Sequence, residues 1–364
     1  MTTLTASNKH LVLLGAGRAN LQVLGGLARQ GKGALGVTLV APHTHYIDRA
    51  MVPGYVAGDY TLDDIRKPLE PLAQAAGVRL ALGNVHTLDV AARRIQLTSG
   101  DALAYDVLSI DCDPVVDRDL LERQTPGARQ GALFMWPLEN FVHLWPQVRA
   151  LAQQRALQVA VIGNGRAAAE IALACASVLA APHGSRVALV TGAAQFLPGE
   201  PPVLQRKVLA KFRQTGITLL PDNCVALDGR ELHLSSGARL ACDAPIMMPP
   251  PTRPAWLLHT GMQASDDGHP VVNERLQSES HRQVFIVPTR APLQLGQVLE
   301  ANLRTALAGG TFARAPLDTS GLRAMQTGSG CALATWGPLA LEGREVWHWK
   351  DRRDRRHLAG LFRH

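Results

Sequence analysis

The stretch from His10 to Gln30, HLVLLGAGRANLQVLGGLARQ, decides the fold of this chain. Its apolar run LVLLG predicts a buried strand, and Gly15 and Gly17 follow at the start of a predicted helix. A strand, a G-x-G turn and a helix begin a mononucleotide-binding unit, in which a pyrophosphate binds at the helix N-terminus. Asn20 stands where the third glycine of the G-x-G-x-x-G pattern would be. The stretch therefore predicts a dinucleotide-type turn with one altered position.

The same pattern occurs a second time. From Gln158 the chain reads QVAVIGNGRAAAEIALACASVL, so that Gly163 and Gly165 follow another apolar strand. Ala168 fills the third position, which tolerates alanine. One G-x-G turn is a weak signal, but two turns in the same strand-to-helix context are a much stronger one. We therefore infer an internal duplication of a nucleotide-binding unit.

The residues that follow each turn also match. Second strands are predicted at 36–42 and 185–192, and the stretches 77–110 and 216–248 each contain a strand, a pair of alternating strands and a last apolar strand. Alternation with a period of two is typical of a hairpin with one buried face. We expect an α/β fold with two Rossmann-like dinucleotide-binding domains.

Composition and charge are consistent with this fold. The 364 residues include many glycines and few aromatic residues, which suits an α/β protein with many tight turns. The net charge of +7 raises the question of a nucleic-acid or membrane partner. No nucleic-acid-binding motif accompanies the charge, so we interpret it as a solvated basic surface and expect no nucleic-acid partner.

The cysteines are odd in number and widely spaced, which excludes a disulfide framework and the spacing of a zinc site. We expect buried or inert thiols, no metal site and a cytoplasmic location with reduced cysteines. The N-terminus shows no signal-peptide pattern, and the longest apolar run is too short to span a bilayer. The cysteines are Cys112, Cys175, Cys224, Cys242 and Cys331.

Two nucleotide-binding units, the second inserted into the first, resemble the flavin-dependent pyridine nucleotide-disulfide oxidoreductases along nearly the whole chain. The chain is most similar to their type II NADH dehydrogenase-like branch, and within it to the flavoprotein domain found fused to selenide, water dikinase. This closer resemblance rests on residues 46–64 (YIDRAMVPGYVAGDYTLDD), residues 196–220 and residues 332–358, of which the last stretch is the most specific.

The resemblance implies a glutathione-reductase-like arrangement of domains. Residues 1–140 and 269–318 would form the FAD-binding-type domain, residues 141–268 the NAD(P)H-binding-type domain, and residues 319–364 a small C-terminal region. The implied cofactors are FAD and NAD(P)H. The implied reaction passes a hydride from the nicotinamide to the flavin and then reduces a quinone-like or other small acceptor.

The resemblance also implies roles for particular residues. Glu170 matches a glutamate near the flavin–nicotinamide contact, although a helix carboxylate satisfied by a neighbour is an equal alternative. The alternative for the glycines of the two turns, which we favour less, is that they serve only the turns themselves. The residues implied to bind cofactor are Gly15, Gly17, Asn20, Tyr46, Pro53, Gly54, Thr289, Gly163, Gly165 and Ala168.

Several cofactor-facing positions depart from the family pattern. The second strand ends in residues 41–43, Ala-Pro-His, where a carboxylate would hold the ribose. Asp111, Asp113 and Asp117 follow the return strand, and negative charge beside a pyrophosphate is unfavourable unless it is paired or solvated. Residues 288–289, Pro-Thr, replace a Gly-Asp pair. Two functions follow: a flavin oxidoreductase with an altered pocket, or a non-catalytic member that has lost FAD and acts as a scaffold or binding partner.

The C-terminal residues 345–364 combine tryptophans with many arginines. A basic amphipathic helix of this kind can lie on an anionic membrane, so peripheral membrane contact through this segment is one interpretation. The other is a terminal helix that docks on its own domain, which the interleaved Asp351 and Asp354 favour.

Overall fold

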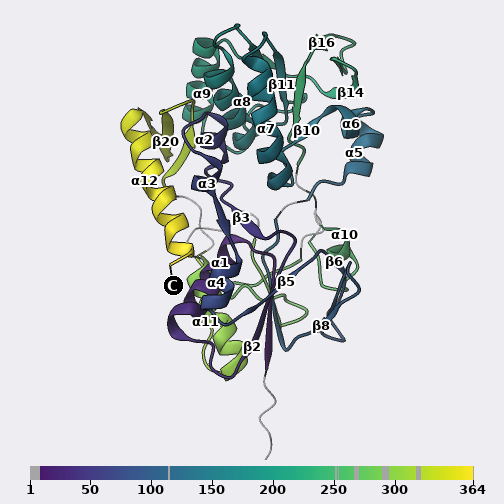
Figure 1. Ribbon diagram of the computed structural model, residues 1–364, viewed down its shortest axis with the longest axis vertical. Helices are drawn as coiled ribbons and strands as arrows, with labels where there is room; N and C mark the ends of the chain where they lie inside the picture. Colours follow the sequence, from purple (N-terminus) through teal and green to yellow (C-terminus); the bar gives the residue numbers. More distant parts are fainter. Residues whose placement is uncertain are drawn as a thin grey trace, which may run out of the picture.

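The computed structural model contains two α/β units, one above the other in Figure 1, with the C-terminal helix running along both. The first G-x-G turn belongs to the lower unit and the second to the upper unit. The structure describes residues 9–113, 115–250, 252, 254–265, 270–288, 295–316 and 321–363.

The lower unit is built on a parallel sheet with the strand order β18-β9-β1-β2-β5. Its last strand in sequence, β18, follows the whole upper unit, so the upper unit is inserted into the lower one. Helix α1 (Arg18–Gln30) packs against α4 (Glu70–Ala75) and α11 (Leu295–Ala308). The strands are β1 (His10–Leu14), β2 (Gly36–Ala41), β5 (Arg79–Leu82), β9 (Val107–Ile110) and β18 (Val284–Ile286).

The upper unit repeats this arrangement in a parallel sheet with the order β10-β17-β11-β12-β13. Its helices are α7 (Leu138–Ala152), α8 (Arg166–Leu179) and α9 (Pro202–Thr215). Edge strand β10 comes from residues before 141. The strands are β10 (Leu133–Phe134), β11 (Gln158–Ile162), β12 (Arg186–Val190), β13 (Thr218–Leu220) and β17 (Ala244–Met247).

Each unit also carries an antiparallel meander, and the two meanders match in detail. The register shifts between Val85 and Thr87 in one and between Cys224 and Ala226 in the other. The predicted duplication and the α/β fold with two Rossmann-like units are therefore confirmed. The meanders are β6 (Val85–Asp89), β7 (Arg94–Leu97) and β8 (Ala102–Ala104), and β14 (Cys224–Asp228), β15 (Glu231–Leu234) and β16 (Arg239–Ala241).

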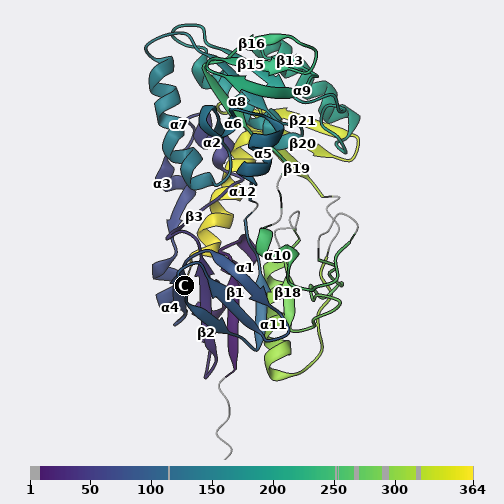
Figure 2. The same cartoon turned by 90° about the vertical axis from the view of Figure 1, so that its right-hand side faces the viewer.

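The C-terminal region forms the sheet β19-β20-β21 and the long helix α12. Figure 2 shows α12 running from the upper unit down to α1. Lys350 on this helix is only 3% exposed; its Nζ lies 2.8 Å from Asp354 Oδ2 and donates to the carbonyl of Ala50. The tail helix is thus docked on its own chain. The elements are β19 (Arg323–Gln326), β20 (Ala332–Trp336), β21 (Leu339–Gly343) and α12 (Arg344–Leu361).

The largest buried cluster of apolar side chains runs through both units and the C-terminal region. Short α2 packs on α8, which brings the two units into direct contact. Within the part of the chain that the structure describes, none of the helices combines the length and apolar character needed to cross a bilayer. The remaining elements are β3 (His45–Ile47), β4 (Arg66–Pro68), α2 (Val52–Val56), α3 (Leu62–Ile65), α5 (Arg118–Gln124), α6 (Ala128–Gly131) and α10 (Ala255–Leu258).

A candidate ligand site at the carboxyl end of the lower sheet

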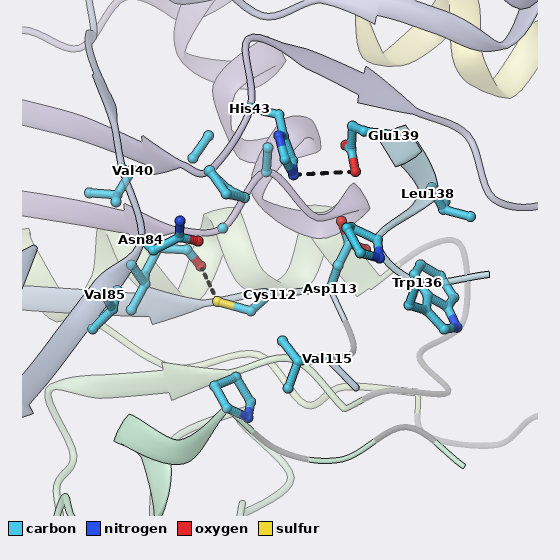
Figure 3. A pocket seen from close by; sticks show the side chains of 18 of the residues that line it. Val40, His43, Asn84, Val85, Cys112, Asp113, Val115, Trp136, Leu138 and Glu139 are labelled. Atoms are coloured by element: carbon cyan, nitrogen blue, oxygen red, sulfur yellow. Dashed lines mark hydrogen bonds and ion pairs between the residues drawn. The ribbon is translucent and has the colours of Figure 1, made fainter. Parts of the chain in front are cut away.

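A cavity of about 390 Å³ lies at the carboxyl ends of β1, β2, β5 and β9. Ligands of open parallel sheets bind at this edge, because the loops after neighbouring strands diverge there. Apolar side chains, among them Val40, Val85 and Val115, line much of the cavity, and the polar groups of His43 and Glu139 lie together at one side (Figure 3). The cavity is a candidate binding site by its position and its lining.

The charged side chains of the cavity come from three segments. His43 follows β2, and its Nε2 lies 3.3 Å from Glu139 Oε2 at the start of α7. Asp113 follows β9 and is exposed at the cavity wall, although many protein atoms surround it. Burial raises the pKa of Asp113, and nearby Arg49 and His43 oppose that rise. The pair of His43 and Glu139 joins the lower unit to the first helix of the upper unit.

Asp111 is the feature of this edge that matters most for ligand binding. Its Oδ2 accepts hydrogen bonds from the backbone N–H groups of Ala19, at 2.8 Å, and Asn20, at 3.0 Å. These amides belong to the first turn of α1, where a dinucleotide unit holds its pyrophosphate. A methyl group at Gly17 would overlap the Asp111 carboxylate. The carboxylate therefore occupies the anion site that the G-x-G turn creates.

The protonation of Asp111 follows from this position. Burial raises its pKa to about 6, and the charge of Asp113 raises it further. The amides of Asn20 and Ala19 and the guanidinium of Arg49 oppose the rise. Because the first turn of a helix stabilises negative charge, the ionised carboxylate remains the main form above pH 7.

Gly15 and Asn20, two further residues of the first turn, serve the fold. Gly15 has φ +89°, and its α-carbon lies against the backbone of Asp111. Asn20 is completely buried; its Nδ2 donates to the carbonyls of Leu14 and Gly15, and its Oδ1 accepts from Ser109 Oγ at 2.6 Å. Asn20 thus ties α1 to the turn and to β9.

The second turn differs from the first in what covers it. A methyl group at Gly163 would lie 2.7 Å from the carbonyl oxygen of Met248, so the return strand approaches closely. Gly165 has φ +100°, and no described atom lies within 4 Å of the position a methyl group would take there. Asn164 Oδ1 accepts from the N–H of Gly165 at 2.8 Å. Ala168 is buried in the core.

The residues predicted to line a flavin ring are buried, and Tyr46 also borders both cavities at this edge. Tyr46 is 7% exposed and packs on Phe362 at the C-terminal end, with ring centroids 6.1 Å apart. Pro53 and Gly54 are buried in α2, and a methyl group at Gly54 would overlap the ring of Tyr60. Thr289, which was also predicted to bind cofactor, lies outside the described residues.

Glu170 lies on α8 opposite the C-terminal sheet. Its Oε1 accepts a hydrogen bond from the backbone N–H of Gln326 at 2.8 Å. Burial raises the pKa of Glu170, and the charges of Arg166 and Lys350 oppose this. Glu170 therefore has a partner within the chain, and its catalytic role stays a prediction.

The three aspartates after β9 have different structural roles. Asp111 caps α1, Asp113 faces the cavity, and Asp117 caps α5 by accepting from the N–H of Leu120 at 2.8 Å. Sequence patterns indicated a charge conflict at this edge but not that one carboxylate would replace the ligand. The position of Asp111 in the sequence could have indicated this, because Asp111 directly follows β9, the strand that pairs with β1. The partnership of His43 with Glu139 joins distant segments and had no such signal.

The residues at this edge do not fit FAD bound as the G-x-G turn implies. The α1 amides are already bonded to Asp111, and the space beside Gly54 is filled by Tyr60 and Gln326. The cavity next to α1, lined by Gly17 and Asp111, has a volume of only about 70 Å³, which holds a few water molecules rather than a pyrophosphate.

Comparisons with known proteins agree with the fold. Residues 9–288 match the model of the pyridine nucleotide-disulphide oxidoreductase family. A search of curated proteins finds no significant match. The sulfide:quinone oxidoreductase of the hyperthermophilic bacterium Aquifex aeolicus is a similar solved structure, with 17% identity, a TM-score of 0.79, and coverage of 97% of this chain and 91% of that one.

Two further solved structures show the same likeness. NDH2 from Plasmodium falciparum, in complex with NADH, has 11% identity and a TM-score of 0.73, over 98% of this chain and 97% of that one. The water-forming NADH oxidase from Lactobacillus brevis, bound to NADH, has 16% identity and a TM-score of 0.71, over 90% and 74%. At these identities the likeness is one of fold.

Proposed function

The chain belongs to the pyridine nucleotide-disulphide oxidoreductase family, and from this premise we propose that it is a non-catalytic member. It has lost FAD and acts as a binding protein on the scaffold of the flavoenzymes. One observation carries this proposal: the Asp111 carboxylate holds the amides of Ala19 and Asn20 on α1.

The energetic argument rests on like charges. A pyrophosphate at α1 would need the same two amides and would lie in contact with the Asp111 carboxylate. Two unit charges 4 Å apart repel by about 4 kcal/mol at an effective dielectric constant of 20, which corresponds to roughly a thousandfold in affinity. Loss of the two amide bonds to Asp111 adds to this cost.

The second candidate is an active NAD(P)H-dependent flavin oxidoreductase that passes electrons to a quinone-like or other small acceptor. The open position beside Gly165 favours it, because no described atom lies within 4 Å of the place that a methyl group would take there. The resemblance to the flavoprotein domain fused to selenide, water dikinase belongs to this candidate and stays a prediction.

The visible spectrum of the purified protein separates the two candidates. We expect a colourless protein that takes up no FAD during incubation and gel filtration and does not oxidise NADH or NADPH. Asp111→Gly removes the carboxylate that blocks the α1 amides, and its FAD uptake is compared with that of the wild type. A near-stoichiometric flavin band that NADH or NADPH bleaches in the wild type would establish the oxidoreductase instead.

A further inference from the structure

The size of the main cavity limits what it can hold. At about 390 Å³ it lies near the lower end of the range of roughly 300–1,000 Å³ that is usual for small-molecule sites. The neighbouring cavity of about 70 Å³, which shares Tyr46, Cys112 and Asp113 with it, ends at Gly17 and Asp111. The site therefore suits one compact ligand rather than a dinucleotide that continues along α1.

The apolar part of the lining suits a flat ring. Trp136 and Trp256 line the cavity together with Val85 and Val115. Indole and aliphatic side chains bind planar heteroaromatic rings by stacking and dispersion. Figure 3 shows Trp136 next to Asp113, so apolar and polar contacts are close together at this wall.

Two acidic residues in the lining favour a ligand that donates hydrogen bonds, and His43, also in the lining, already pairs with Glu139. Asp113 and Glu139 are both carboxylates, which accept hydrogen bonds and, when ionised, donate none. Arg118 also lines the cavity, but its guanidinium lies over the ring of Phe134, 4.9 Å from the centroid. Hydroxyl and amino groups of a neutral ligand can donate hydrogen bonds to such carboxylates. A sugar with free hydroxyls on a heteroaromatic base has both features.

We infer that the cavity binds a phosphate-free nucleoside and that Asp111 is the residue that excludes the corresponding nucleotides. The inference rests on the proposed loss of FAD, since both depend on the occupied α1 amides. A nucleoside uses the two tryptophans and the carboxylates of Asp113 and Glu139. The small cavity adjoins the main one and is lined by Gly17 and Asp111, so a phosphate that extends from the sugar into it would meet the Asp111 carboxylate.

Isothermal titration at pH 8 with adenosine, guanosine, cytidine and uridine, and with the diphosphate of each, tests this inference. We expect at least one nucleoside to bind and to bind about a hundredfold more tightly than its diphosphate, because the diphosphate faces an ionised carboxylate. Asp111→Asn should reduce this preference to less than about tenfold. Asp111→Ser, a second uncharged cap, is the substitute if the first variant does not fold.

Two further variants test the cavity itself. Asp113→Asn removes a charged acceptor and should weaken nucleoside binding by roughly tenfold or more. Asp119→Asn is the matched control, because Asp119 lies on α5, is exposed and pairs with Arg129 away from the cavity. It should leave every affinity unchanged.

The outcomes are distinguishable from those of the proposed function. The inference is overturned if no nucleoside binds, or if a nucleoside and its diphosphate bind equally. A colourless protein would in that case still support the proposed loss of FAD. Stoichiometric FAD on the wild type overturns both. A preference for the nucleoside over its diphosphate that persists unchanged in Asp111→Asn shows that another residue excludes phosphate, and this result overturns the role of Asp111.

Discussion

At the scale of single residues, Asp111 combines a structural and a selective role in one carboxylate. It satisfies two amides at the start of α1 that would otherwise need water or a ligand. The cost is burial, which raises its pKa to about 6 because the ionised form loses the most hydration. This cost can be measured as a pH-dependent change in the free energy of unfolding.

We expect Asp111→Asn to stabilise the fold at pH 8. A carboxyl group with a raised pKa contributes its full stability below the unfolded pKa of about 3.9, and the contribution is lost as the pH rises through about 6. The free energy of unfolding of the variant should exceed that of the wild type by roughly 2 to 3 kcal/mol at pH 8 and match it near pH 4. Urea titrations at both pH values measure this, and a pH-independent difference would contradict the raised pKa.

Asn20 is expected to be essential for the fold and irrelevant to cofactor binding. Its amide makes three buried hydrogen bonds, to Leu14, Gly15 and Ser109. Asn20→Gly, which restores the full glycine pattern, should therefore lower the free energy of unfolding by about 2 to 4 kcal/mol and should not give a flavin-binding protein. Thermal denaturation and FAD uptake measure the two effects. Ser109→Ala removes one of the three bonds and should lower the free energy of unfolding by less. FAD uptake by Asn20→Gly would contradict the purely structural role of Asn20.

At the scale of elements, the duplicated units share hydrogen bonds as well as strand order. Asp106 Oδ2 accepts from the N–H of His10 at 2.7 Å, and Asp243 Oδ2 accepts from the N–H of Gln158 at 2.9 Å. In each case the aspartate before the return strand holds the first residue of the central strand. The two units differ where ligands would bind: among the described residues, a carboxylate bonds the first amides of α1 but not those of α8.

Helix α12 contains a buried ion pair between Lys350 and Asp354, and loss of this pair should be costly. Asp354→Leu leaves the buried ammonium of Lys350 without its carboxylate, which should lower the free energy of unfolding by about 3 to 5 kcal/mol. The double variant Lys350→Met, Asp354→Leu should recover most of this loss. Asp63→Asn breaks the exposed pair with Arg66 and should cost under about 1 kcal/mol. Urea unfolding compares the three; equal effects for the exposed and buried pairs would argue against a docked α12.

Membrane contact through 345–364 stays a prediction. The docked face of α12 includes Leu358 and Leu361, which are buried. Sedimentation with anionic vesicles tests whether the remaining basic face binds membranes. We expect weak, salt-sensitive binding, because both leucines of α12 are buried within the chain, whereas Trp349 is 39% exposed. Salt-resistant binding would contradict this expectation.

At the scale of the whole molecule, the two units share one core. The main apolar cluster extends from α1 through α2 and α8 to α12. We therefore expect one cooperative unfolding transition, with coincident curves from circular dichroism and tryptophan fluorescence. Two resolved transitions would show that the units fold independently. Gln326→Ala would weaken the contact between the C-terminal region and the lower unit, because the Gln326 side chain donates a hydrogen bond to Asp59 of the lower unit.

The fold could be predicted from local patterns because each pattern lies within a short stretch. The runs around Gly15 and Gly163 contain the strand, the turn and the helix start in sequence order. Alternation at 94–104 and 231–241 predicted the last two strands of each meander. Hydrophobic periodicity and turn residues act over a few neighbours, so they can be recognised without the folded chain.

The contents of the site could not be predicted in this way. Asp111 meets Ala19, His43 meets Glu139, and Gln326 meets Glu170 only because the sheets and the C-terminal region bring distant segments together. A hydrogen bond depends on distances of a few tenths of an ångström, and local patterns carry no such information across a hundred residues. The chain pattern therefore determined the nucleotide-binding architecture, while tertiary packing decided that a carboxylate of the protein occupies its anion site.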